Sequence, residues 1–138
     1  MEIRYKDNFE DAALIRKTVF MQEQGFENEF DAIDDIAIHV TLYEDGNVVG
    51  CARTYTQGNP KEVHIGRIAI LKPYRKQGYG SKLVRACEKQ YMHEDVDFIL
   101  SSQYDKRAFY ASLGYEERGS IYMDETVPHI EMIKKHKD

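Results

Sequence analysis

The chain has 138 residues, 42% of them hydrophobic and 31% charged, and a formal net charge of −5 at pH 7. This length suffices for one domain with a buried core, and the acidic balance argues against a general nucleic-acid-binding protein. No apolar stretch approaches the roughly 20 residues that span a bilayer, and residues 1–5 lack the apolar region of a signal peptide. We therefore expect a cytoplasmic protein without membrane contact.

The first third of the chain predicts a strand at 3–5 and then a helix. Asp7 or Asn8 can cap this helix, and Gly25 ends it. The apolar residues that share one face of it are Ala12, Ile15 and Val19. Residues 38–43 and 49–55 alternate in polarity around the turn Asp45-Gly46, which predicts a β-hairpin.

The acidic excess lies between the helix and the hairpin, in a segment that we expect to hold a short helix around Phe30 and Ile33. Residues 23–35 contain no Lys or Arg but six carboxylates: Glu23, Glu27, Glu29, Asp31, Asp34 and Asp35. Two interpretations are open. The segment forms an acidic wall that attracts a cationic ligand, or it is a solvated acidic helix.

A long strand is expected at 62–71. Its apolar residues change parity along the chain: Val63 and Ile65, then Ile68 and Ile70. One register cannot place both pairs on one face. A bulge near Gly66-Arg67 would reconcile them, and so would the mixed burial of a central strand.

Residues 67–80 read RIAILKPYRKQGYG, an apolar strand followed by a basic turn with two glycines. The helix that begins after Gly80 has first-turn N–H groups without intrahelical partners. Gly78 and Gly80 have no Cβ, so a phosphate can approach the backbone closely. The pattern differs from the P-loop, which needs Gly-Lys-Ser/Thr, and from the dinucleotide fingerprint, which needs a third glycine. It therefore predicts an anion site, with a plain basic turn as the alternative.

The second half predicts a helix over 81–91, a strand at 98–100, a short helix that Asp105 caps and that ends at Gly114, and two last strands. These strands start at Tyr115 and at Ile130. The two cysteines, Cys51 and Cys87, have no metal-ligand spacing and are expected to be reduced core residues; no metal site is predicted. The order of elements predicts a single mixed α/β domain over residues 1–138.

Arg75-x-x-Gly78-x-Gly80 resembles the acetyl-coenzyme A signature of the GNAT acyltransferase superfamily, and Phe109-Tyr110-x-x-x-Gly114-Tyr115 resembles a second signature of that family. Pro128-His129-Ile130-x-Met132 is similar to a segment of small bacterial single-domain GNAT proteins. The resemblance implies the GNAT acyl-CoA N-acyltransferase fold, in which helices flank a mixed central sheet that is splayed between strands 4 and 5. It also implies that acetyl-CoA is the co-substrate.

In that fold the pantetheine arm lies along the fourth strand and the pyrophosphate lies on the glycine turn. The resemblance assigns these cofactor-binding residues: Ile68, Ala69, Ile70, Arg75, Lys76, Gln77, Gly78, Tyr79, Gly80, Ser81, Gln103 and Tyr110.

Acetyl transfer needs a polarised thioester carbonyl, a neutral amine and a proton for the leaving thiolate. The N–H of Ile70 is our candidate for the first task. Tyr110 is our candidate general acid, because a phenol titrates near ~10 and stays protonated at neutral pH. The alternative is a tyrosine that only packs in the core. The candidates for the base that deprotonates the amine are Glu62, His129, His64 and His39.

We expect the acceptor to be a small cationic amine near residues 23–35 and the C-terminal strands. Relatives often carry Glu before the Arg-Ile of the fourth strand, whereas this chain has Gly66. A non-catalytic acyl-CoA sensor is therefore one alternative, and an interaction module whose acidic segment docks a basic protein is another. The sequence leaves the oligomeric state open, with a homodimer as one alternative.

Overall fold

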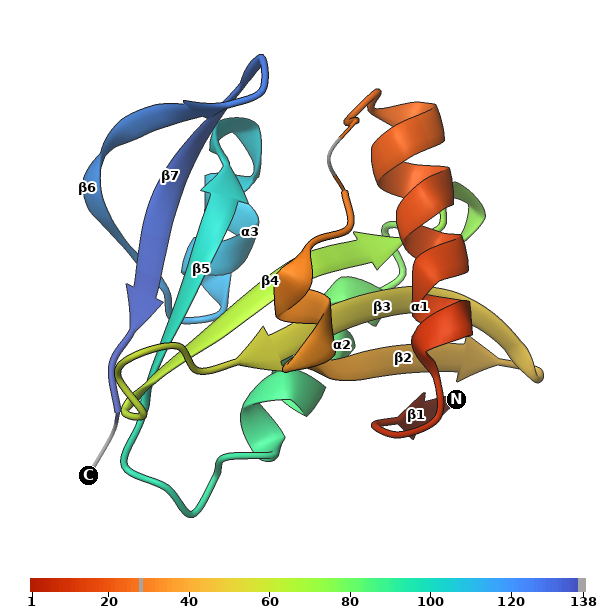
Figure 1. Cartoon of the computed structure of the whole chain (residues 1–138), viewed down its shortest axis with the longest axis horizontal. Coiled ribbons are helices and arrows are strands. Elements are labelled where there is room, and N and C mark those ends of the chain that lie inside the picture. Colours follow the sequence, from red (N-terminus) through yellow and green to blue (C-terminus); the bar gives the residue numbers. More distant parts are fainter. Residues whose placement is uncertain (28, 137–138) are drawn as a thin grey trace.

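The computed structural model describes residues 1–27 and 29–136, so residues 28, 137 and 138 of the expected domain lie outside the described part. The elements follow the expected order (Figure 1). The first half contains β1 (Glu2–Arg4), α1 (Phe9–Arg16), its π-helical continuation η1 (Lys17–Glu23), the 3-10 helix η2 (Ala32–Asp35), β2 (Ile38–Glu44), β3 (Asn47–Tyr55) and β4 (Glu62–Ile70). The second half contains η3 (Lys72–Tyr74), α2 (Tyr79–Lys89), β5 (Asp97–Gln103), η4 (Tyr104–Lys106), α3 (Arg107–Ser112), β6 (Glu116–Asp124) and β7 (Val127–Lys134).

The seven strands form one sheet in the order β1-β2-β3-β4-β5-β7-β6. All neighbours are antiparallel except β4 and β5, which are parallel. The β4–β5 register runs only from Glu62 opposite Asp97 to Ile65 opposite Leu100. Beyond that point the two strands diverge, as the V between them in Figure 1 shows. The predicted splay between strands 4 and 5 is therefore confirmed.

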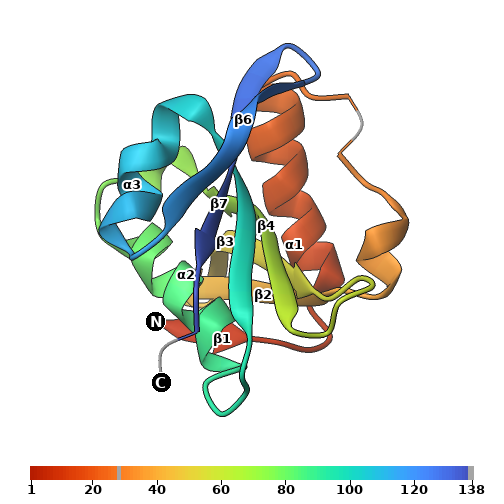
Figure 2. The same cartoon turned by 90° about the vertical axis from the view of Figure 1, so that its left-hand side faces the viewer.

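The helices cover both faces of this sheet. Figure 2 shows α1 on one side of the strands and α2 and α3 on the other. On the α1 side, Ala12, Ile15 and Val19 pack against Cys51 and Ala69, which confirms the predicted helix face. On the other side, α2 packs on the strands through Leu83, Ala86 and Cys87. Both cysteines are free and fully buried, as expected.

A bulge in β4 resolves the change of parity in its sequence. Cys51 faces Ala69 and Arg53 faces Gly66, so Arg67 and Ile68 together lie opposite the single residue between Cys51 and Arg53. The predicted bulge at Gly66–Arg67 is therefore confirmed. Because of it, Ile65, Ile68 and Ile70 all pack against the core under α2, despite their different parity.

Asn8 is the N-cap residue of α1, as predicted, but without a side-chain capping bond, and the predicted cap Asp105 is wrong. Asn8 occupies the N-cap of α1, but its side-chain amide donates to the carbonyls of Arg4 and His39 and to Thr41 Oγ1 instead. The amide is buried, so it bonds the nearby strand groups rather than the helix. Asp105 lies inside η4, one residue before the N-cap of α3, because a 3-10 turn precedes that helix.

Two other local predictions hold. Gly114 follows α3 with φ of 99°, a left-handed conformation that suits glycine at a helix end. Asp45 and Gly46 both have positive φ in the turn between β2 and β3, as a two-residue hairpin requires. Within the described ranges, no helix has the length and apolar character needed to cross a membrane.

Candidate active site

A cavity of about 880 Å³ lies where β4 and β5 diverge. Eleven of the predicted site residues line it: Ile68, Ala69, Ile70, Arg75, Lys76, Gly78, Gly80, Ser81, Gln103, Tyr110 and His129. Three others do not line it: Glu62, Gln77 and Tyr79. The second half of β4, the glycine turn and the start of α3 thus surround one space, because β5 pairs only with the first half of β4 and then turns away from it.

The side chains of the three excluded residues have other surroundings. The Tyr79 hydroxyl donates to Glu44 Oε2 at 2.6 Å, and the Gln77 amide donates to the Pro73 carbonyl at 3.1 Å. Glu62 lies at the start of β4, opposite Asp97, in the paired part of the two strands. The Tyr79 hydroxyl is thus engaged with β2 and the Gln77 amide with the turn itself.

The glycine turn leads directly into α2. Gly78 is the N-cap of that helix with φ of 85°, and nothing lies within 4 Å of the position that a Cβ would take there. At Gly80 a Cβ would lie 3.1 Å from Phe109 Cζ of α3, which shows how closely the turn packs on that helix. The first-turn amides of α2 have no intrahelical acceptor and carry the positive end of the helix dipole. This end of the cavity suits an anion.

Arg75 is held by protein groups at the same end. Its Nη1 and Nη2 donate to the two carboxylate oxygens of Glu23 at 2.6 and 2.8 Å, and its Nε donates to the Ile70 carbonyl at 2.8 Å. The pair joins the end of η1 to the glycine turn. A ligand that takes Arg75 must therefore compete with Glu23.

Tyr110 lies deeper in the cavity, on α3. It is 8% exposed, and its ring packs edge-on against Phe109 with centroids 5.0 Å apart. Burial raises the pKa of the Tyr110 phenol well above its usual range. No hydrogen bond joins its hydroxyl to another residue in the part of the chain that the structure describes. The phenol is therefore protonated at neutral pH, and its proton is not committed to a protein acceptor.

His129 reaches the cavity from β7, where it lies opposite Gln103 of β5 and Tyr122 of β6. Its Nδ1 lies 2.9 Å from the Val127 carbonyl. A carbonyl can only accept, so Nδ1 carries the proton and Nε2 carries the lone pair. The ring stacks on Tyr122 at 6.0 Å between centroids. In the neutral ring this hydrogen bond thus selects the tautomer whose lone pair lies on Nε2.

The other base candidates are placed differently. His64 also lines the cavity, stacked on Tyr55 with ring centroids 5.0 Å apart. His39 does not line it, because its Nε2 donates to the Asp34 carbonyl at 3.0 Å behind the acidic segment. The structure therefore brings His129 and His64, but not His39 or Glu62, into the space that Tyr110 lines.

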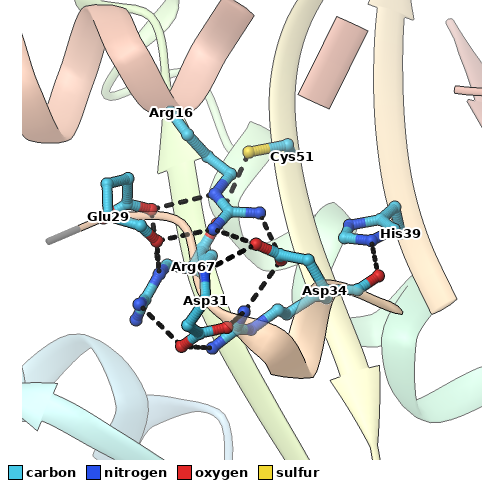
Figure 3. Close-up of polar contacts among 8 residues, drawn as sticks. Arg16, Glu29, Asp31, Asp34, His39, Cys51 and Arg67 are labelled. Carbon is cyan, nitrogen blue, oxygen red and sulfur yellow. Dashed lines mark hydrogen bonds and ion pairs between the residues drawn. The ribbon is translucent and has the colours of Figure 1, made fainter. Parts of the chain in front are cut away.

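The acidic segment lines the cavity through Glu29, but most of its carboxylates are paired with arginines, so it is neither a wall of free negative charge nor a solvated helix (Figure 3). Arginines distant in sequence neutralise most of its carboxylates. Arg16 of α1 pairs with Glu29 at 2.9 Å and with Asp34 at 2.7 Å. Arg53 of β3 pairs with Asp31 at 2.7 Å and with Asp34 at 2.8 Å. Arg67 of β4 pairs with Glu29 at 2.8 Å. Together with the Glu23–Arg75 pair, these contacts engage four of the six carboxylates.

Burial and charge act in opposition on these carboxylates. Burial would raise the pKa of Asp34, but hydrogen bonds from Arg16 and the Asp31 amide outweigh it, and the pKa falls to about 2. For Glu29 burial prevails, and its pKa is raised although Arg67 and Arg16 lie beside it. Asp34 is therefore the firmly ionised centre of the cluster.

Sequence reasoning missed a polar row on the three strands beside the cavity. Ser101, Tyr122, Asp124 and Glu131 all line the cavity. The Tyr122 hydroxyl and Ser101 Oγ are hydrogen-bonded, and Arg118 donates to Glu131 at 2.7 Å. At the tip of the β6–β7 hairpin, Glu125 accepts the Glu27 amide at 3.1 Å. The alternation of His129 and Glu131 along the last strand was the available signal.

Comparison with known proteins agrees with the fold. Residues 6–136 match the family described as Acetyltransferase (GNAT) domain, so the chain belongs to the GNAT acetyltransferase family. It is an acyl-CoA-dependent N-acetyltransferase. It is similar to the uncharacterized N-acetyltransferase YjcF of Bacillus subtilis, with 29% identity over 133 residues that cover 94% of both chains.

Two solved structures share the fold. An acyl-CoA N-acyltransferase from Pseudomonas aeruginosa is 22% identical, with a TM-score of 0.84 over 96% of this chain and 97% of that one. An aminoglycoside 6'-N-acetyltransferase in complex with coenzyme A is 16% identical, with a TM-score of 0.74 over 97% of this chain and 96% of that one.

Proposed function

We propose that the protein transfers an acetyl group from acetyl-CoA to the amine of a small cationic acceptor, by direct attack in a ternary complex. One observation carries the proposal: Tyr110, with a protonated phenol, and His129, with a basic Nε2, line one cavity beside the unpaired half of β4. The chain also resembles the small bacterial single-domain GNAT proteins with a Pro-His-Ile-x-Met segment, and we infer that it belongs to that branch.

The backbone of β4 supports the proposed position of the cofactor. The Leu71 amide donates to the Val49 carbonyl of β3 at 2.9 Å. Successive amides of a strand point to opposite sides, so the Ile70 amide points away from β3, toward the gap that β5 leaves. The pantetheine arm would add along this edge, and its pyrophosphate would reach the amides of the glycine turn. The Ile70 N–H is then placed to donate to the thioester oxygen.

The reaction assigns one task to each group. The neutral amine attacks the thioester carbon, and His129 Nε2 accepts the proton that the attacking nitrogen loses as the C–N bond forms and passes it on to solvent. The developing oxyanion accepts a hydrogen bond from the Ile70 N–H. The new C–N bond forms as the C–S bond breaks, and Tyr110 gives its proton to the departing thiolate. Because the cavity holds both substrates, much of the entropic barrier is removed on binding.

The charge of the acceptor is inferred from the hairpin side of the cavity instead of the acidic segment, whose carboxylates are mostly paired. Asp124 and Glu125 line the cavity at the β6–β7 turn, and the rings of Phe20, Phe26 and Tyr122 line it nearby. Carboxylates and aromatic faces both attract an ammonium group. Asp31 and Asp34 are engaged internally, which weakens the alternative that this segment docks a basic protein.

Calorimetric titration with acetyl-CoA and a thiol-release assay over a panel of small amines test the proposal together. We expect binding of acetyl-CoA, and turnover with cationic amines that the variant His129→Gln greatly reduces. The matched control is His93→Gln, which changes an exposed histidine outside the cavity. Absence of binding at millimolar acetyl-CoA would refute the proposal, and binding without turnover of any amine would identify an acyl-CoA sensor.

A further inference from the structure

Arg67 occupies a backbone conformation that residues with a side chain rarely adopt. It lies at the first position of the β4 bulge with φ of 52°, in the left-handed region. Glycine is the usual residue at such a bulge position. A strained conformation of this kind persists only where the surrounding structure holds it in place. The contacts of Arg67 should therefore show what holds the bulge.

The acidic segment supplies these contacts. The Nε of Arg67 lies 2.8 Å from Glu29 Oε2 and also donates to the Glu29 carbonyl at 3.1 Å. Its Nη2 lies 3.4 Å from Asp31 Oδ2. The Arg67 carbonyl in turn accepts a hydrogen bond from the buried Cys51 thiol at 3.5 Å. Both the side chain and the backbone of Arg67 are thus tied to neighbouring elements (Figure 3).

The carboxylates that hold Arg67 are themselves fixed. Glu29 is 4% exposed and is also bound by Arg16, which is 1% exposed. Asp31 is bound by Arg53 at 2.7 Å, and Asp34 joins Arg16 to Arg53. The charged hydrogen bonds of Glu29 and Asp34, which are shielded from water, are strong and have defined directions. The cluster therefore acts as a rigid brace between α1, β3 and the bulge.

The bulge determines where the following backbone points. Only Ile68 and Ala69 separate Arg67 from Ile70, whose amide faces the gap between β4 and β5. A change of register or twist at Arg67 would turn that amide away from its target.

We propose that Glu29 and Asp31 are positioning residues that act through Arg67: they hold the left-handed bulge and so aim the Ile70 amide at the thioester oxygen. This inference rests on the proposed function in naming the thioester oxygen as the target of the amide. The effect of the brace on the backbone of β4 does not depend on the proposed function. It assigns the acidic segment to the geometry of the acyl site rather than to acceptor binding.

The test compares Glu29→Gln in two backgrounds, the natural one and Arg67→Gly. Glycine adopts a left-handed φ without strain, so the bulge should not need the brace in the second background. We expect Glu29→Gln to lower kcat about tenfold in the natural background, which is about 1.4 kcal/mol in the barrier, and less than about twofold beside Arg67→Gly. The affinity for coenzyme A should fall less than kcat, because the glycine turn that would hold the pyrophosphate is outside the brace and only the pantetheine arm lies along β4.

Amide NMR spectra of the ligand-free protein give a readout that needs no activity. Glu29→Gln should shift the resonances of residues 68–70 and leave those of 78–82 unchanged. Asp35→Asn is the matched control, because it removes the same charge from an exposed residue of the same segment that is outside the brace. If Glu29→Gln does not fold, Asp31→Asn replaces it, since Asp31 is partly exposed and Arg53 keeps Asp34 as a partner.

Unchanged resonances of residues 68–70, or equal losses of kcat in both backgrounds, would overturn the inference. If the proposed function fails instead, the natural protein will not acetylate small cationic amines, while the resonances still report on the brace. The two failures are therefore distinguishable.

Discussion

Removing one oxygen atom from Tyr110 tests the proposed chemistry most directly. The substitution Tyr110→Phe keeps the ring that packs against Phe109 and Tyr115 and removes only the proposed proton donor. The hydroxyl makes no hydrogen bond to another residue of the described chain, so the folded state loses little. We expect the free energy of unfolding to change by less than about 1 kcal/mol.

The expected effect on turnover is much larger. A positioned general acid contributes on the order of 10²-fold to the rate, so kcat should fall about a hundredfold, which is about 2.7 kcal/mol in the barrier. Burial raises the pKa of Tyr110, so the natural enzyme should not lose activity through phenol ionisation up to about pH 10. The measurements are thiol release at saturating acetyl-CoA as a function of pH, and thermal unfolding of both proteins.

The matched control is Tyr104→Phe, because this tyrosine lies in the turn before α3 and does not line the cavity. It should leave kcat unchanged. A loss of less than about threefold in Tyr110→Phe would show that the phenol is not the proton donor. A large loss of kcat together with a large loss of thermal stability would point to packing instead.

Four further predictions concern the ion pairs and the glycine turn. Asp34→Asn should destabilise the fold by about 3 kcal/mol or more, because buried Arg16 and Arg53 both lose a partner, and thermal unfolding should show a Tm about 10 °C lower. Asp35→Asn is the control, and equal Tm values for the two variants would contradict the buried cluster. Because folding lowers the pKa of Asp34 from 3.8 to about 2, the ionised carboxylate stabilises the fold above about pH 4, and this contribution should disappear as the pH falls toward 2. Acid unfolding curves of the natural protein and of Asp34→Asn measure it. Glu23→Gln removes the carboxylate that competes for Arg75, so calorimetry should show acetyl-CoA binding about two- to fivefold more tightly. Weaker binding would mean that the Glu23–Arg75 ion pair holds Arg75 in the position that the ligand needs. In Gly78→Ala the added Cβ would have no atom within 4 Å, but alanine is strained at φ of 85°, so the free energy of unfolding should fall by about 1 kcal/mol. Calorimetry should show acetyl-CoA binding about tenfold more weakly, and unaltered affinity would exclude close approach of the ligand to this position.

The glycine turn and the strand before it could be predicted from the sequence because their signals are local. The glycine turn, the apolar strand before it and the change of parity at Gly66–Arg67 all lie within about twenty residues of one another. Each follows from backbone geometry: a left-handed turn, a helix start, and a side-chain period of two. Local patterns of this kind remain visible in a single chain.

The surroundings of the acidic segment could not be predicted in the same way. The sequence shows six carboxylates without a base in residues 23–35, and this pattern alone predicts a negative surface. Their partners Arg16, Arg53 and Arg67 come from three other elements, and nothing in their spacing links them to the acidic segment. The polar row on β5, β6 and β7 likewise depends on the strand order in the sheet.

The sequence by itself determined the fold class, the order of elements and the glycine turn at a helix start, because periodicity and turn residues act over short distances along the chain. The tertiary structure alone decided which two of the candidate histidines line the cavity, and that arginines from other elements pair with most carboxylates of the acidic segment. These properties depend on atoms brought together from distant positions, and electrostatic and hydrogen-bond energies are set by distance and burial in space.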